Sequence, residues 1–211
     1  MLTLTPLPYS YAGLEPVISA RSVRAHHDVL QARYVEGFNK LLKKHPKLAE
    51  YGSLATLFTQ LGEVRKRFGR QAAEDAEFYG GGAANHEFYW KVTDPSNSLP
   101  SLALIRAVQK DMGGVGEMLQ QLKQVSLGIR GSSWGWLVYD LDACGLRVTS
   151  TSDQTSPLVF RQYPVIGVDV WEHAYYLDYT TQRAEYLDRW CDLINWQTVS
   201  AAFAQATEFP A

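Results

Sequence analysis

The stretch Asp169-Val170-Trp171-Glu172-His173-Ala174-Tyr175-Tyr176 is the part of the chain that says most about its fold and chemistry. It places a carboxylate, Asp169, four residues before an imidazole, His173, and surrounds both with aromatic side chains. A carboxylate oxygen and an imidazole nitrogen at this spacing can reach one metal ion. Asp169 stands where a predicted strand ends, and His173 stands in the helical turn that follows.

Strands are predicted only in the part of the chain that leads up to Asp169. Three segments there are rich in β-branched and aromatic residues and are separated by turn signals, at 134–141, 146–150 and 159–168. They predict a three-stranded antiparallel sheet. Helical patterns resume at 172–179 and 183–207.

The first half of the chain shows helical periodicity instead. After a proline-containing lead-in, helices are expected from Ser22 to Pro46, over 54–68 and over 71–90, with a break or kink at 80–82. The stretch 94–100 is the clearest linker, and two further helices are expected at 101–112 and 114–127. We therefore predict an α+β protein with an N-terminal helical hairpin domain, 1–93, and a C-terminal α/β domain that contains the antiparallel sheet, 94–211.

Composition narrows the functional classes. The chain has 211 residues and a formal net charge of -2, with no long basic block, so nucleic-acid binding is not expected. Cys144 and Cys191 form no C-x-x-C pair, which excludes a zinc ribbon or a thioredoxin-like site. The N-terminus lacks a signal peptide, and no long apolar run is present, so a membrane partner is not expected and the cytoplasm is the expected location.

Two histidines far upstream are candidates to join Asp169 and His173. His26 lies eight residues before Tyr34, so both should point to one side of a helix, while His27 should face about 100° away. His86 follows the glycine run 80–82. A single helical histidine is more often packed or exposed than metal-bound, but three histidines with one carboxylate would leave a coordination position open and would suit iron or manganese.

The chain resembles the iron/manganese superoxide dismutases over nearly its whole length. The matching segments occur in the order and at the spacing of that family: Leu7-Pro8-Tyr9-Ser10-Tyr11 with Leu14-Glu15-Pro16, His26-His27, Asn85-His86-x-x-Tyr89-Trp90, Gly131-Ser132-Ser133-Trp134-Gly135-Trp136-Leu137, Ser150-Thr151-Ser152-Asp153-Gln154-Thr155-Ser156-Pro157, and the run from Asp169 to Tyr176.

The resemblance implies a role for each matching residue. It implies His26, His86, Asp169 and His173 as the ligands of one manganese or iron ion per chain. Tyr34 matches a tyrosine at the mouth of the substrate funnel. The other matches are aromatic residues that line the pocket, two residues at a subunit interface and a supporting arginine: Trp134, Trp171, Glu172, Tyr176 and Arg183.

The family also places one glutamine beside the solvent molecule at the metal. Manganese-type members usually carry it in the sheet, at the position of Gln154, and iron-type members usually carry it four residues before the second histidine, where this chain has Gly82. The resemblance therefore implies a manganese-type arrangement, with manganese favoured over iron.

The sequence departs from the family pattern between His26 and Tyr34. The family usually reads His-His-x-x-His-His-x-x-Tyr, whereas this chain has Leu30 and Gln31 at the second pair. The usual histidine at position 30 bonds an interface tyrosine of the other subunit, the counterpart of Tyr176, and a leucine can neither donate nor accept. Ala83 and Ala184 replace a common histidine and a common proline.

The resemblance implies that the chain disproportionates superoxide to dioxygen and hydrogen peroxide as a homodimer, or as a homotetramer if Leu30 changes the interface. Steering of the anionic substrate would fall to local positive charge such as Arg183. One alternative is a non-haem iron oxygenase, although four protein ligands leave little room for substrate and dioxygen. The other is a non-catalytic metal-binding homologue, which Leu30 motivates.

Overall fold

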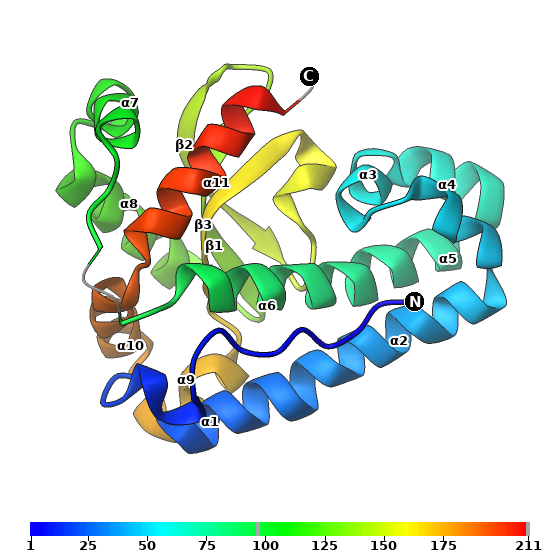
Figure 1. Cartoon of the computed structure of the whole chain (residues 1–211), viewed down its shortest axis with the longest axis horizontal. Coiled ribbons are helices and arrows are strands. Elements are labelled where there is room, and N and C mark those ends of the chain that lie inside the picture. Colours follow the sequence, from blue (N-terminus) through cyan, green and yellow to red (C-terminus); the bar gives the residue numbers. More distant parts are fainter. Residues whose placement is uncertain (96–97, 210–211) are drawn as a thin grey trace.

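The computed structural model describes residues 1–95 and 98–209, so part of the predicted linker, residues 96–97, lies outside the described residues. A long helical hairpin stands beside a small sheet that further helices cover (Figure 1). The α-helices and strands are α1 (Ala20–Arg24), α2 (Ala32–Lys44), α3 (Leu54–Thr59), α4 (Leu61–Phe68), α5 (Arg70–Asp75), α6 (Gly81–Val92), α7 (Leu102–Met112), α8 (Val115–Gly128), β1 (Ser133–Asp140), β2 (Gly145–Ser152), β3 (Gln162–Asp169), α9 (Glu172–Tyr179), α10 (Arg183–Trp190) and α11 (Trp196–Glu208). The predicted α+β class is confirmed.

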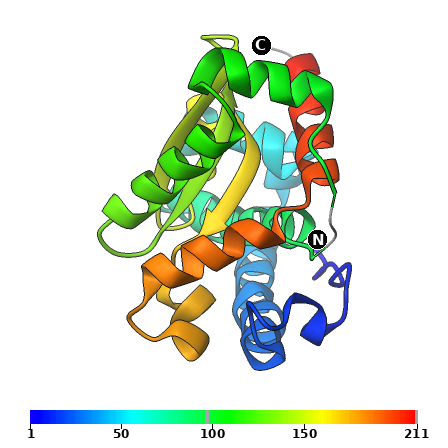
Figure 2. The same ribbon diagram turned by 90° about the vertical axis from the view of Figure 1, so that its left-hand side faces the viewer.

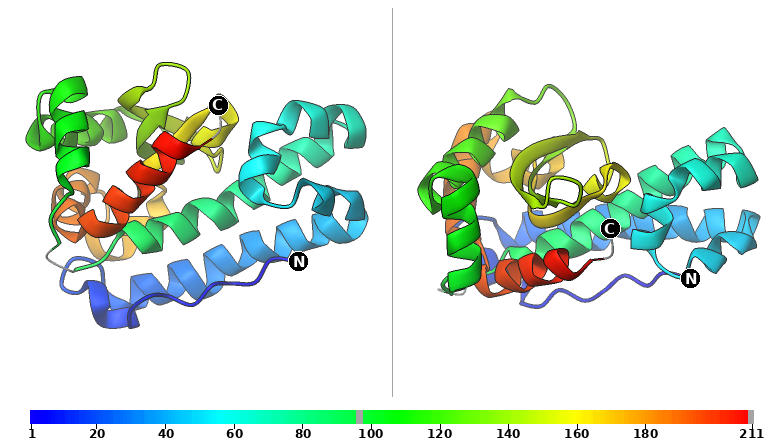
Figure 3. Two further views of the ribbon diagram at one scale, coloured as in Figure 1. Left: turned by 45° about the horizontal axis from the view of Figure 1, so that its top comes forward. Right: turned by 90° about the horizontal axis from the view of Figure 1, so that it is seen from above.

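The two arms of the hairpin are α2 and α6, which lie side by side in every view (Figures 1 and 3). A π-helical segment precedes each of these helices and extends the arm toward its N-terminal end. Ala25–Gln31 joins α1 to α2, and Ala76–Gly80 joins α5 to α6, so the chain is helical without interruption over 20–44 and over 70–92. The side chain of Ser19 caps the first arm by accepting a hydrogen bond from the backbone N–H of Ser22.

The predicted helix break at 80–82 is wrong. The helix continues through the glycines, because their role is close approach rather than flexibility. A Cβ atom at Gly81 would overlap the backbone oxygen of Gln154, and one at Gly82 would overlap the ring of Tyr34. The helix expected over 54–68 is divided at Gln60 into α3 and α4.

The sheet is three-stranded and antiparallel, with β1 in the centre and the order β2-β1-β3. Trp134 at the start of β1 pairs with Asp169 at the end of β3, which fixes the edge of the sheet that carries the carboxylate. The third strand starts later than expected. Pro157–Phe160 forms a 3-10 turn capped by Ser156, and Arg161 has a φ of 57°, which ends that turn.

Helices cover the sheet from two directions, as Figure 2 shows. α7 packs against β2 and α8 against β1 and β2, whereas α6 and α11 pack against β3. The single helix expected over 183–207 is instead α10, a 3-10 turn and α11. The break is fixed by Ile194, which forms a bridge with Thr93, and by Asn195, whose side chain accepts from the N–H of Thr198 as the cap of α11.

The main hydrophobic core lies where the hairpin, the sheet and α10 meet. Its largest fully buried side chains are aromatic: Trp134, Trp136, Trp190, Tyr89 and Tyr186. A second, smaller core fills the far end of the hairpin around Phe38 and Phe58. Within 1–95 and 98–209, no helix is both long and apolar enough to cross a membrane.

Candidate metal centre

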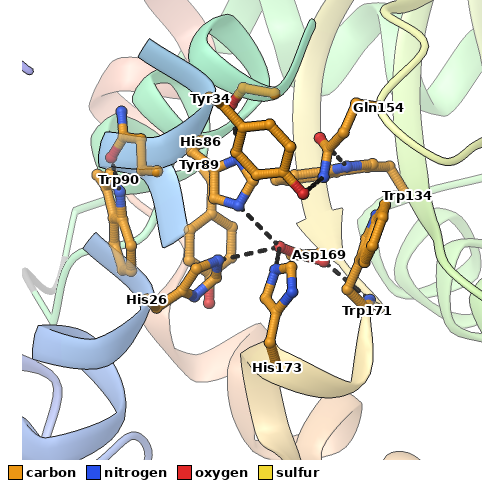
Figure 4. A network of polar contacts seen from close by, with 12 residues as sticks. His26, Tyr34, His86, Tyr89, Trp90, Trp134, Gln154, Asp169, Trp171 and His173 are labelled. Atoms are coloured by element: carbon orange, nitrogen blue, oxygen red, sulfur yellow. Dashed lines mark hydrogen bonds and ion pairs between the residues drawn. The ribbon is translucent and has the colours of Figure 1, made fainter. Parts of the chain in front are cut away.

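Four donor side chains from four different elements converge on one point (Figure 4). His26 comes from the first π-helical segment, His86 from α6, Asp169 from the end of β3 and His173 from the first turn of α9. One potential ligand atom of each residue lies within 4.8 Å of those of the other three. The Nε2 atoms of His26, His86 and His173 are 3.1, 3.6 and 3.2 Å from Oδ2 of Asp169.

Burial keeps the two upstream histidines neutral. Removal from water lowers the pKa of His26 to about 4 and that of His86 to about 3. Burial would raise the pKa of the Asp169 carboxyl, but the neighbouring His173 and His26 hold it well below its usual value. The centre therefore offers the neutral imidazoles of His26 and His86 beside a carboxylate, and this is the protonation state that metal binding requires of these groups.

The ring nitrogens of the two upstream histidines that face Asp169 have no hydrogen-bond partner among the described residues. Nε2 of His26 and Nε2 of His86 are buried and make no hydrogen bond in the described structure, because their approach to Asp169 lacks hydrogen-bond geometry. Nδ1 of His86 lies 2.6 Å from the carbonyl oxygen of Gly82. A carbonyl can only accept, so Nδ1 carries the proton and the Nε2 lone pair faces the centre. The Nε2 lone pair of His86, the buried and unpartnered Nε2 of His26 and the carboxylate of Asp169 together fit a cation.

A second group of polar residues reaches the centre from the sheet. Gln154, which is fully buried, donates from Nε2 to the hydroxyl of Tyr34 at 3.0 Å. Its Oε1 accepts from the indole N–H of Trp134 at 3.1 Å. The ring of Tyr34 lies 5.2 Å from that of His86, between centroids, and burial raises the pKa of Tyr34 to about 12. The phenol is therefore neutral at ordinary pH.

The backbone of Gln154 is clamped to α6. Asn85, which precedes His86 and is buried, donates from Nδ2 to the carbonyl oxygen of Gln154 at 3.0 Å. Gly81 makes room for that same carbonyl. Helix α6 thus carries His86 and also fixes the position of the Gln154 backbone relative to it.

Indole rings enclose the four donors. Trp134 meets His86 edge to face with centroids 5.2 Å apart, and Trp171 stacks on His173 at 5.2 Å. The backbone N–H of Trp171 also donates to the second carboxylate oxygen of Asp169 at 2.8 Å. These rings exclude water, which strengthens every polar contact inside.

The remaining residues suggested by the resemblance stay outside this group. Glu172 and Tyr176 are exposed on α9, and Leu30 is half-buried. The guanidinium of Arg183 donates to the hydroxyl of Tyr175 at 3.1 Å and to the carbonyl oxygen of Ile129 at 2.9 Å, not to the four donors.

Two contacts at the centre were not anticipated from the sequence. The hydroxyl of Tyr186 donates to the backbone oxygen of Asp169 at 3.0 Å, and Oε1 of Gln31 accepts from the indole N–H of Trp90 at 2.8 Å. The partners of both bonds are buried, and they lie 17 and 59 positions apart in the chain. The only signal in the sequence is a polar side chain at a position that packs inward.

Comparison with known proteins identifies two matching family models. The model described as the alpha-hairpin domain of the iron/manganese superoxide dismutases matches residues 1–94. The model of the C-terminal domain of the same proteins matches residues 100–202. The two matches leave out only the linker region and the last residues.

Two relatives from Leptolyngbya boryana cover nearly all of the chain. Superoxide dismutase (Mn) 1 is 39% identical over 206 residues, which is 96% of this chain and 81% of the relative. Superoxide dismutase (Mn) 3 is 32% identical over 206 residues, which is 97% of this chain and 84% of the relative.

Proposed function

The chain belongs to the iron/manganese superoxide dismutase family, and we propose that His26, His86, Asp169 and His173 are the residues that bind its metal ion. The enzyme converts two superoxide ions and two protons into dioxygen and hydrogen peroxide. Manganese or iron, when bound, supplies the one-electron oxidation and reduction of superoxide. The convergence of the four donor atoms within 4.8 Å is the observation that carries the ligand assignment.

Gln154 and Tyr34 are proposed to manage protons and solvent. A glutamine amide nitrogen has two hydrogens, and Tyr34 takes only one of them, so the second can be donated to a water molecule in the centre. Tyr34 keeps its own proton because of its raised pKa, so its hydroxyl can donate that proton during turnover. The position of Gln154 at the end of the sheet supports a preference for manganese over iron.

Trp134 and Trp171 are proposed to line the pocket around the metal position. Trp134 orients Gln154 through its indole N–H, and Trp171 holds Asp169 through its backbone N–H. Both therefore position a polar group as well as exclude water.

A homodimer is proposed as the working assembly, with a homotetramer as the alternative. Glu172 is exposed on α9, and Tyr176 is 50% exposed although it is a large aromatic residue. A second copy on this face would cover both. Arg183 is proposed to support the same region, because it ties α10 to the residues that precede β1. Steering of superoxide is not assigned to it.

The domain boundary is proposed at 93/94, with the helical hairpin domain before it and the α/β domain after it. The ligand set then draws two histidines from the first domain and Asp169 with His173 from the second. The cytoplasm is the proposed compartment. The non-catalytic alternative is not favoured, since the matched relatives are named superoxide dismutases.

The decisive experiment measures metal content and superoxide consumption together. Wild-type protein should hold about one manganese or iron ion per chain, and His86→Ala should lose both metal and activity. His45→Ala is the matched control, because His45 lies at the far end of the hairpin against Phe68, with ring centroids 5.9 Å apart. Full metal binding and activity in His86→Ala would refute the ligand set.

A further inference from the structure

Trp90 is the indole that backs the candidate ligand His26. It is 3% exposed, and its ring centroid lies 4.9 Å from that of His26 at an interplanar angle of 69°. Tyr89 packs on His26 from another direction, at 5.7 Å. The described residues show no hydrogen bond to Nδ1 of His26, in contrast to His86 and its carbonyl partner. The imidazole of His26 is therefore oriented by the rings around it.

Gln31 determines how Trp90 lies. Its Oε1 accepts the indole N–H at 2.8 Å, and Gln31 is 1% exposed. The indole nitrogen is a donor only, so leaving it buried without an acceptor would destabilise the fold. Rotation of the Trp90 ring away from His26 would break this bond, so the bond locks the ring plane.

The π-helix explains how Gln31 comes to serve His26. Both residues belong to the segment Ala25–Gln31 and are five positions apart. In an α-helix five residues would turn about 140° from the starting side. The i→i+5 hydrogen bonding of a π-helix reduces that offset and brings both side chains toward α6, where Trp90 lies.

The Gln31–Trp90 pair also forms a boundary toward solvent. Both residues line a surface recess of about 190 Å³ together with Pro6, Pro8 and Lys91. The recess reaches one side of Trp90, and His26 packs against this same indole.

We propose that Gln31 is a positioning residue for the reaction: by accepting the indole hydrogen bond it holds Trp90 against His26 and keeps Nε2 of His26 directed at the metal position. This proposal rests on the proposed role of His26 as a ligand. Gln31 touches neither metal nor substrate, and its effect passes through Trp90.

A double-mutant cycle tests the chain of contacts. Gln31→Leu removes the acceptor and Trp90→Phe removes the donor, and each should weaken manganese(II) affinity about tenfold, measured by competition with a chelator. The double variant should bind manganese(II) no less tightly than the single variant with the lower affinity, because the two residues act as one unit. Gln31→Glu keeps an acceptor oxygen and should restore most of the affinity.

The metal-free protein supplies an independent readout. The indole N–H resonance of Trp90, assigned from its absence in Trp90→Phe, should shift in Gln31→Leu and stay near its wild-type position in Gln31→Glu. Thr93→Val is the matched control, because Thr93 is the buried acceptor of another indole, that of Trp190, at 3.2 Å. This control should lower the melting temperature as Gln31→Leu does, with manganese affinity unchanged.

The outcomes separate the two proposals. A shifted Trp90 resonance with unchanged affinity in Gln31→Leu, or affinity losses that simply add in the cycle, would overturn the role of Gln31. Should Gln31→Leu fail to fold, unchanged affinity in Trp90→Phe would overturn it equally. Failure of the ligand assignment would be seen in other measurements: the wild-type protein would contain no metal, or His86→Ala would bind manganese(II) with full affinity.

Discussion

The amide nitrogen of Gln154 lies 3.0 Å from the hydroxyl oxygen of Tyr34, although 120 positions separate the two residues in the chain. Gln154 follows β2 in the C-terminal part, whereas Tyr34 belongs to α2 of the hairpin. The bond therefore ties the two halves of the molecule together beside the four candidate metal ligands (Figure 4). The proton supply that we propose for Tyr34 and the packing of the two halves against each other depend on the same contact.

Gln154→Leu should raise the pKa of Tyr34 further above about 12, because the amide donor stabilises the phenolate. The variant should also lose about 1–3 kcal/mol of stability, since the buried indole N–H of Trp134 loses its acceptor. An ultraviolet titration with Tyr34→Phe as the blank measures the pKa. Gln205→Leu is the control, because Gln205 accepts from Tyr163 at 3.2 Å on the surface. A lower Tyr34 pKa in Gln154→Leu would contradict the assignment.

Gly81→Ala should destabilise the protein by about 1–3 kcal/mol or more, because the new Cβ would overlap the backbone oxygen of Gln154 and force it away. Superoxide consumption should fall with the displaced glutamine. Gly116→Ala is the matched helical control. A Cβ atom built at Gly116 has nothing within 4 Å, so this variant should be more stable than the wild type by about 0.5–1 kcal/mol. Denaturant unfolding of both variants gives the comparison, and equal stability of the two would be inconsistent with the close approach.

The metal-free protein should lose stability as the pH falls from about 6.5 to about 3. The folded-state pKa values of His26 and His86 are about 4 and about 3, so the unfolded chain takes up protons first. In this window each histidine lowers the free energy of unfolding by up to about 1.4 kcal/mol for each pH unit of acidification. Above pH 6.5 both histidines are neutral in the folded and unfolded states, so this loss is absent. Urea unfolding at a series of pH values measures the slope. His86→Gln should make it shallower, and a flat profile in the wild type would refute the prediction.

Tyr176→Glu should convert the proposed dimer to monomers, because a charge would be buried at the contact between subunits. The monomer fold should survive, since Tyr176 is 50% exposed in the single chain. Leu127→Glu is the control, because Leu127 is 45% exposed on α8. Light scattering at several protein concentrations gives the mass of each. A dimeric Tyr176→Glu protein would place the interface on another face.

The four donors of the centre could be predicted from the sequence because they sit in motifs with fixed spacing. Asp169 and His173 lie four residues apart, where a strand meets a helix, and the sheet was indicated by segments rich in β-branched and aromatic residues with turn signals between them. The structure brings all four together as expected.

Other features depend on packing between distant segments and produce no periodic pattern in the sequence. The glycines at 80–82 suggested a break, because the sequence does not distinguish a glycine that bends the chain from one that admits a neighbouring backbone. The Gln31–Trp90 bond joins residues 59 positions apart, and its geometry depends on the phase of a π-helix. A search for a period of 3.6 residues has no means of detecting that phase.

The π-helical segment Ala25–Gln31 makes the number of residues in the first arm as important as their identity. A π turn holds more residues than an α turn, so deleting one residue there would give a plain α-helix and leave the residues beyond it close to their present phase. Deleting one residue after the segment and before Tyr34 has no such compensation, and it would turn Tyr34 about 100° around the axis, away from Gln154. We therefore expect the first arm to tolerate a change of length inside the π-helical segment better than one just after it, where a single deletion would break the contact with Gln154 without changing any of the four candidate ligands.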